Sequence, residues 1–202
     1  MRGSLVQVQE GEQLNNNYDM IPKVILYIAM SEDGFIAGEN DNIDFLNDYQ
    51  TEGEDYGYFK FIESVGSVVV GRKTYDKVVG MGYPYHSDKE VYVITKAQKP
   101  SSKDITYYNG DITSLIEKLK LPNSGNIYCD GGSEVAHLLL ANNLIDEIIL
   151  SVIPTQLKKG TLLFADGVVP TNFENSNKVE FKSGLIQYTY YLKAVVAQLV
   201  EH

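Results

Sequence analysis

The chain has 202 residues, 44% of them hydrophobic and 22% charged, which is typical of a globular domain with a sizeable core. The formal net charge is −10 and no run of Lys and Arg exceeds two residues, which excludes a broad surface for nucleic acid or anionic membranes. No apolar run approaches the ~18 residues that span a bilayer, so we expect no membrane partner.

A single cysteine, Cys129, excludes an internal disulfide framework and a multi-cysteine metal site, so we expect no metal. Because Cys129 lies in an apolar strand, a buried and inert thiol is expected rather than a nucleophile. A single cysteine with no disulfide partner in the chain fits the reducing cytoplasm. We therefore expect a cytoplasmic protein that binds a small molecule, as a monomer or a homodimer.

The two ends of the chain differ from its middle. Residues 1–20 are polar, lack any helical or strand period and contain an Asn triplet, which predicts a disordered leader or an added segment. Residues 195–202 look like a similar tail. No repeat or low-complexity linker divides residues 21–194, which are predicted to form one domain.

The first predicted strand, residues 23–30, is a continuous apolar run, as expected for a strand that is buried on both faces. A turn-rich loop follows it, at the strand end where ligands bind in open α/β sheets. Residues 51–65 then place apolar side chains on one helical face. Asp55 either points towards that apolar side or caps the first turn of the helix, and both interpretations stay open.

Two strands run directly into glycine and a helix. The strand at 67–70 is followed by Gly71, two cations and Thr74, a pattern that suits a phosphate but also fits a solvated turn. The strand at 127–129 is followed by Gly131 and Gly132 and then by a helix. Paired glycines let the backbone approach a ligand, and a helix N-terminus attracts anions. We therefore predict a nucleotide cofactor, with a tight turn that binds nothing as the alternative.

The remaining elements complete the fold class. Strands are expected at 90–95, 105–108 and 146–153, and a helix at 112–120. Residues 178–183 and 185–193 are expected to form a hairpin around Gly184. Strands that alternate with helices and end in a hairpin predict an α/β fold. It has three layers: a mostly parallel central sheet with an antiparallel C-terminal hairpin, and helices on both faces. The loops at 33–38, 71–74 and 131–133 would then line one crevice.

With these residues in place, the chain resembles the dihydrofolate reductase superfamily from residue 22 to residue 193. It is most similar to the bacterial dihydrofolate-reductase-like proteins that share a domain with the riboflavin-pathway reductase. The matching pieces occur in the order of the family. They are Ile28-Ala29 with the DGFIAG loop, the segment 55–60 (DYGYFK), VVVGRKT at 68–74, Gly131-Gly132, and IILSVI at 148–153.

This resemblance implies that NADPH lies across the C-terminal edge of the sheet. Arg72 would bind the adenosine 2′-phosphate, with Lys96 as a second cation, which favours NADPH over NADH. Residues 32–44 would form a mobile lid that excludes water. The implied cofactor-binding residues are Ala29, Ile36, Gly38, Gly71, Arg72, Lys73, Thr74, Thr95, Lys96, Gly131, Gly132, Ser133 and Glu134.

The resemblance also implies the chemistry. Asp55 would be the active-site carboxylate, oriented by Ser151, in a hydride transfer to a C=N bond of dihydrofolate or a related pterin, forming tetrahydrofolate. The implied substrate-binding residues are Ile28, Ala29, Phe45, Tyr58 and Phe59. The aromatic members of this set fit a hydrophobic core equally well.

Two departures from the family pattern bear on the substrate. Folate enzymes carry an Arg for the glutamate tail where this chain has Asp88, so dihydrofolate loses an anchor unless Lys60, Lys89 or His86 replaces it. Asp130 replaces an apolar residue and is expected to brace the glycine turn. An altered pocket would also be expected to confer resistance to antifolate inhibitors.

Two alternative functions remain open. One is reduction of a ribosylated aminopyrimidine in riboflavin synthesis. The other is a nucleotide-binding module without catalysis. Deamination is excluded because the chain lacks the H-x-E and C-x-x-C zinc signature.

Overall fold

The computed structural model describes residues 21–82, 84–97 and 99–193. The predicted leader, residues 1–20, and the predicted tail, residues 195–202, lie outside the described residues. In the described part of the chain, no helix is both long and apolar enough to cross a membrane.

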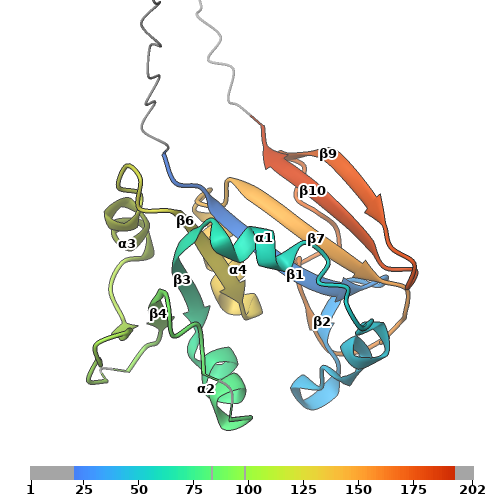
Figure 1. The fold of residues 1–202 in the computed structure, drawn as a ribbon, viewed down its shortest axis with the longest axis horizontal. Helices are drawn as coiled ribbons and strands as arrows, with labels where there is room; N and C mark the ends of the chain where they lie inside the picture. Colours follow the sequence, from blue (N-terminus) through green and yellow to red (C-terminus); the bar gives the residue numbers. More distant parts are fainter. Residues whose placement is uncertain (1–20, 83, 98, 194–202) are drawn as a thin grey trace, which may run out of the picture.

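An eight-stranded sheet forms the centre of the molecule, in the order β5-β4-β3-β6-β1-β7-β10-β9 (Figure 1). The first six strands of this order, from β5 at the edge to β7, pair in parallel with their neighbours. Strand β10 is antiparallel to both of its neighbours, β7 and β9. The strands are β1 (Val24–Ser31), β3 (Val65–Gly71), β4 (Glu90–Ile94), β5 (Ile105–Tyr108), β6 (Asn126–Gly131), β7 (Glu147–Ile153), β9 (Phe173–Glu180) and β10 (Ile186–Leu192). A second, small sheet pairs β2 (Phe35–Ala37) with β8 (Thr161–Leu162).

Helices cover both faces of the sheet. α1 (Tyr58–Glu63) and α2 (Arg72–Gly80) pack on one face, in a cluster that includes Phe61 and Val68. α3 (Ile112–Leu119) and α4 (Ser133–Ala141) pack on the other, in a cluster that includes Leu115 and Leu139. Two short 3-10 helices, η1 (Glu39–Asp41) and η2 (Asp44–Tyr49), follow β2. The predicted three-layer α/β fold is confirmed.

Burial on both faces explains why the sequences of the central strands are continuous apolar runs. In β1, Val24 and Leu26 join the cluster under α3 and α4, whereas Ile25 joins the cluster under α1 and α2. Residues 68–70 of β3 are fully buried. A strand with two dry faces must be apolar at every position, so the runs fix which strands lie at the centre of the sheet.

The structure differs from the sequence-based expectations at two elements. The helix predicted over residues 51–65 begins only at Tyr58, because Tyr56 (φ 54°) and Gly57 (φ 84°) both adopt left-handed backbone conformations that an α-helix does not accept. The hairpin strand expected from residue 178 begins at Phe173. Its polar stretch is an exposed edge strand with a single buried residue, so it lacks an alternating pattern.

Gly66 of β3 provides a test of how closely the loop before β6 packs on the sheet. A Cβ at this position would lie 1.8 Å from the carbonyl oxygen of Ser124, so Gly66→Ala must displace backbone. We expect a loss of about 3 kcal/mol or more in the free energy of unfolding, measured by denaturant titration. Gly80→Ala is the matched control, because its Cβ would meet nothing within 4 Å. An equal effect of both substitutions would contradict this packing.

Candidate active site

The two predicted glycine junctions meet at the C-terminal edge of the sheet. β3 and β6 pair in parallel with Val70 opposite Gly131, so the chain leaves both strands at the same level. A Cβ at Gly71 would lie 3.5 Å from the carbonyl oxygen of Gly131 and 3.3 Å from a methyl group of Val135. Gly131 has φ +83°, a conformation that other residues rarely adopt. Glycine is therefore required where the two junctions touch.

A hydrogen bond joins these junctions. The backbone N–H of Gly132 donates to Oγ1 of Thr74 over 3.1 Å. A Cβ at Gly132 would lie 2.9 Å from the same oxygen, so a side chain there would push Thr74 away. The first N–H groups of α2 and α4 have no partners within their own helices. Together they form a cradle of donors and a hydroxyl that fits the diphosphate of a dinucleotide.

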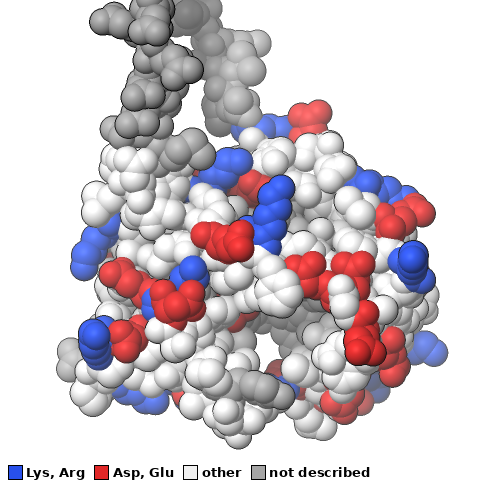
Figure 2. Space-filling view, in the orientation of Figure 1, with Lys and Arg blue, Asp and Glu red and all other residues white. Residues whose placement is uncertain are grey.

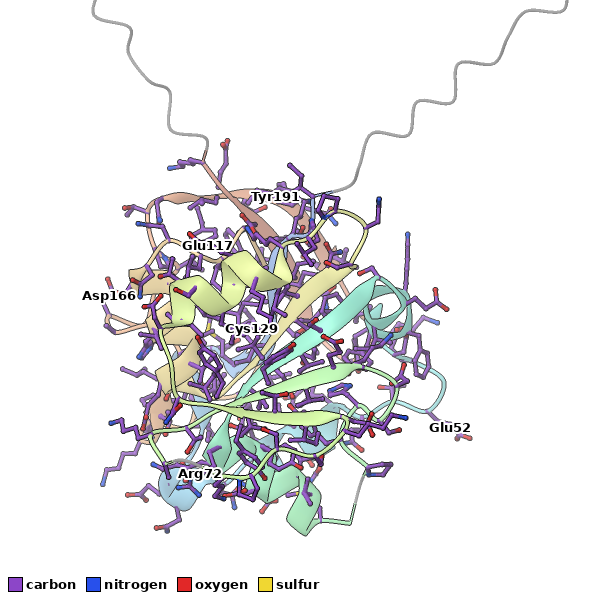
Figure 3. The ribbon with its side chains drawn as sticks, turned by 90° about the vertical axis from the view of Figure 1, so that its left-hand side faces the viewer. Glu52, Arg72, Glu117, Cys129, Asp166 and Tyr191 are labelled. Carbon is purple, nitrogen blue, oxygen red and sulfur yellow. The ribbon has the colours of Figure 1, made fainter. Side chains whose placement is uncertain are left out.

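The predicted cations lie on the rim of this cradle. Arg72 pairs with Asp76 through Nη1 and Oδ2 at 2.6 Å, and both side chains are 42% exposed. Lys73 lies 3.8 Å from Glu134, with both side chains largely in solvent. Exposed pairs of this kind contribute little to stability, so a phosphate can replace the carboxylate partner. Arg72 lies at the opposite end of the molecule from Tyr191 (Figure 3), in agreement with its place at the C-terminal edge.

The other residues proposed for the cofactor lie around the same edge. Thr95 is buried and its hydroxyl accepts from the N–H of Ala97 at 3.2 Å, whereas Lys96 is exposed. Ala29 lies opposite Ser151 in the β1–β7 pairing. A Cβ at Gly131 would lie 3.4 Å from Cδ1 of Ile28, so this side chain borders the glycine pair.

The predicted lid is folded onto helix α2. Nζ of Lys77 hydrogen-bonds the carbonyl oxygen of Asp41 in η1, and the N–H of Gly38 donates to the carbonyl oxygen of Asn42 at 2.7 Å. Phe45 is half-buried in η2, and Ile36 packs against the core. Figure 2 shows a hollow between the surface over α2 and the surface over the segment after β2. The lid therefore forms one wall of this hollow.

Asp55 caps helix α1. Its carboxylate accepts the N–H of Gly57 at 3.1 Å and the N–H of Phe59 at 2.8 Å. These two bonds lower the pKa of Asp55 below its ordinary value, because they favour the charged form. Ser151 does not bond to Asp55 in the described part of the chain, and its Oγ accepts from Nε2 of Gln187 at 3.2 Å. Each carboxylate oxygen of Asp55 keeps a second lone pair for a ligand.

The predicted aromatic residues of α1 have two different environments. Tyr58 packs edge-to-face on Tyr27, with ring centroids 5.7 Å apart, and burial raises the pKa of its hydroxyl to about 12. Phe59, one residue further on, is 69% exposed. Tyr58 is thus part of the hydrophobic layer, whereas Phe59, whose backbone N–H donates to Asp55, offers an exposed ring.

A second carboxylate lies deeper in the site, and the sequence did not predict its surroundings. The hydroxyl groups of Tyr85 and Tyr128 both donate to Asp130, Tyr128 over 2.5 Å. Nε2 of His86 lies 3.9 Å from the same carboxylate. Burial raises the pKa of Asp130, and the tyrosine bonds and His86 offset part of this effect. The signal in the sequence that could have indicated this site is an acidic residue, Asp130, at the end of a buried strand and just before the glycine pair.

Comparisons with known proteins identify relatives of this chain. The model of the RibD C-terminal domain family matches residues 83–186. The uncharacterized protein YwjB of Bacillus subtilis (strain 168) is 38% identical over 145 residues, which cover 70% of this chain and 82% of YwjB. The uncharacterized protein YyaP of the same organism is 28% identical over 182 residues, covering 84% of this chain and 94% of YyaP.

Two solved structures share the fold. A protein from Shewanella sp. PV-4 that is named for riboflavin biosynthesis superposes with a TM-score of 0.75 at 26% identity, over 85% of this chain and 99% of its own. Dihydrofolate reductase from Enterococcus faecalis, solved with NADP(H), gives a TM-score of 0.63 at 17% identity, over 85% and 97% of the two chains. The molecule is thus a dihydrofolate-reductase-like α/β protein.

Within that class, the chain belongs to the RibD C-terminal domain family. The predicted membership of the dihydrofolate reductase superfamily, and the predicted likeness to the riboflavin-pathway reductase, are both confirmed.

The pH dependence of folding tests the capping role of Asp55. A carboxyl whose pKa is lowered in the folded state stabilises the protein above its unfolded pKa of about 3.9, and this stabilisation is lost as the pH falls through the folded pKa. We expect Asp55→Asn to be less stable than wild type at pH 7 and equally stable at pH 2 in thermal unfolding. Asp104→Asn, at an exposed position, is the control. A pH-independent difference would argue against the charged cap.

Proposed function

We propose that this protein is an NADPH-dependent reductase that transfers a hydride to a C=N bond of a pyrimidine or pterin substrate. The observation that carries this proposal is the contact between the two glycine junctions. Thr74 and Gly132 are hydrogen-bonded at a strand edge, where a Cβ on Gly132 would lie 2.9 Å from the Thr74 hydroxyl oxygen. A diphosphate fits this cradle, and a reductase of the same fold binds NADP(H).

Different residues would bind the diphosphate, the 2′-phosphate and the nicotinamide of the cofactor. Backbone N–H groups of residues 131–133 and the hydroxyl of Thr74 would hold the diphosphate, and Arg72 would bind the 2′-phosphate after release from Asp76. Ala29, Ile28 and Ile36 would lie against the nicotinamide, which supplies the hydride when the cofactor is bound. The segment from Gly38 to Asp44 would close over it and exclude water.

Asp55 is the proposed partner of the substrate ring. Its lowered pKa keeps it charged at neutral pH, so it accepts hydrogen bonds from ring N–H groups through its free lone pairs. The exposed ring of Phe59, whose backbone N–H donates to Asp55, would stack on the substrate. Asp55 and Phe59 therefore bind and orient, and the proposal assigns no proton transfer to either.

Among possible substrates, we place a ribosylated aminopyrimidine first and dihydrofolate second. Lys89 is paired with Asp88 at 3.2 Å, and its side chain is only 14% exposed, so its charge is already matched. Nε2 of His86 lies 3.9 Å from Asp130, and its side chain is only 17% exposed. Neither is placed to anchor the carboxylate tail of a folate, which removes two of the three substitutes for the missing Arg. The match to the RibD C-terminal domain family, and the likeness to a protein named for riboflavin biosynthesis, also favour the aminopyrimidine.

Cofactor binding and turnover test the proposal together. NADPH titrated by fluorescence should bind the wild type, and Gly132→Ala should weaken binding at least about tenfold, because the added Cβ displaces Thr74. Gly80→Ala should bind as wild type does. Oxidation of NADPH is then followed with the ribosylaminopyrimidine phosphate and with dihydrofolate, for wild type and for Asp55→Asn.

We expect oxidation with one of the two substrates and a raised KM in Asp55→Asn. Binding of NADPH without oxidation in the presence of either substrate would instead identify a nucleotide-binding module. Equal NADPH affinities of the wild type and Gly132→Ala would contradict the cradle itself.

A further inference from the structure

Four polar side chains gather between helices α1 and α2, next to the glycine pair of β6. They are Asp130 and Tyr128 of β6, and Tyr85 and His86 of the segment that joins α2 to β4. The side chain of Asp130 is 22% exposed and that of His86 is 17% exposed. The cluster is therefore mostly withdrawn from water.

The hydrogen bonds around Asp130 leave capacity for one more proton. Tyr85 donates to Oδ2 and Tyr128 donates to Oδ1, so each carboxylate oxygen has one donor and a second lone pair free. A charge in a dry site is costly, and two neutral donors compensate for only part of that cost. Protonation relieves it without breaking either tyrosine contact.

The backbone at His86 holds the histidine against this carboxylate. His86 adopts φ +42°, an uncommon value for a residue with a side chain, and its carbonyl oxygen accepts the N–H of Lys89 at 2.9 Å. Strained conformations persist where the surrounding structure holds them, and they cluster at functional sites. The strain therefore marks the position of His86 between solvent and Asp130.

Other titratable groups surround the cluster from each packed element. Tyr58 of α1 and Tyr75 of α2 are phenols with raised pKa, because burial disfavours their charged forms. Cys129 of β6 is buried, with a thiol pKa raised to about 12. Asp88 and Lys89 pair with one another. The phenols and the thiol are neutral at pH 7, and Asp88 and Lys89 match each other's charge, so Asp130 and His86 are the remaining ionisable groups of the cluster.

We propose that Asp130 is the proton donor of the reductase, with His86 as the group that reprotonates it from solvent. This inference rests on the proposed function and adds to it the second half of the reaction. NADPH, when bound, would supply the hydride for the carbon of the substrate C=N bond, and the π electron pair would move onto nitrogen. That nitrogen takes the proton of the Asp130 carboxyl group, which becomes a carboxylate. A proton from water returns to it through His86.

Tyr85 and Tyr128 are positioning residues in this scheme. Their hydroxyl groups stabilise the carboxylate that remains after proton transfer, and they fix its orientation beside Gly131. Asp55 is unsuited to the same role, because its backbone bonds lower its pKa and it holds no proton at neutral pH. The two carboxylates thus divide binding and proton transfer between them.

The first test is the titration of Asp130 in the protein without cofactor, followed by the NMR signal of its side-chain carboxyl carbon. We expect a midpoint above that of an ordinary aspartate. Tyr85→Phe should raise it further, because the lost donor favoured the charged form. An ordinary midpoint that does not respond to Tyr85→Phe overturns the proposal. This readout needs no substrate, and Tyr85→Phe keeps the test decisive if Asp130→Asn does not fold.

The second test is the pH profile of kcat with the substrate that the wild type reduces. The wild-type rate should fall as the pH rises through the Asp130 midpoint, and Tyr85→Phe should move this limb to higher pH. Asp130→Asn should lower kcat about 10²- to 10⁴-fold and remove the limb, with NADPH affinity unchanged. His86→Gln should slow turnover less. Asp104→Asn is the matched control and should behave as wild type.

Three outcomes distinguish this inference from the proposed function. A change in KM alone in Asp130→Asn would make the residue a binding group and overturn the proton-donor role. An unchanged pH limb in Tyr85→Phe would do the same. Failure of the wild type to bind NADPH would refute the proposed function, and it would be seen before any variant is measured.

Discussion

Parallel pairing of β6 between β3 and β1 is the constraint on which the rest of the structure depends. Parallel strands end at the same edge, so their loops converge without any need for contacts between distant helices. Burial of both faces fixes the register, because a shift by one residue would exchange the two apolar layers. The close approach of Gly71, Gly131 and Gly132 then follows from strand spacing alone.

The environments of the two carboxylates explain how one fold can offer two kinds of acid. Asp55 lies at a helix start with two backbone donors and open solvent, so it stays charged. Asp130 lies among aromatic rings, where desolvation outweighs the two tyrosine hydroxyls. The local surroundings, rather than the shared fold, therefore set the direction in which the pKa of each acid is shifted.

Much of the fold could be predicted from periodicity. The apolar runs at residues 23–30 and 67–70 predicted two central strands, β1 and β3, and the glycine junctions predicted where β3 and β6 lead into helices. The late start of α1 could not be predicted, because it depends on a left-handed Tyr56 whose hydroxyl contacts Tyr49 and, from a distant segment, Ser183. The cluster around Asp130 could not be predicted from the sequence either, because Tyr85 and Asp130 are 45 residues apart and share no sequence pattern. The link from Ser151 to Gln187 likewise joins two strands that only the sheet brings together.

The backbone amide signals of Gly132 and Ser133 during NADPH titration test the central claim most directly. If the glycine junctions of β3 and β6 form a diphosphate cradle, these two amides shift in a saturable manner at the same concentrations as the bulk binding signal, together with the amide of Thr74. Saturable binding that leaves all three amides unchanged, with shifts confined to other edges of the sheet, would contradict the account.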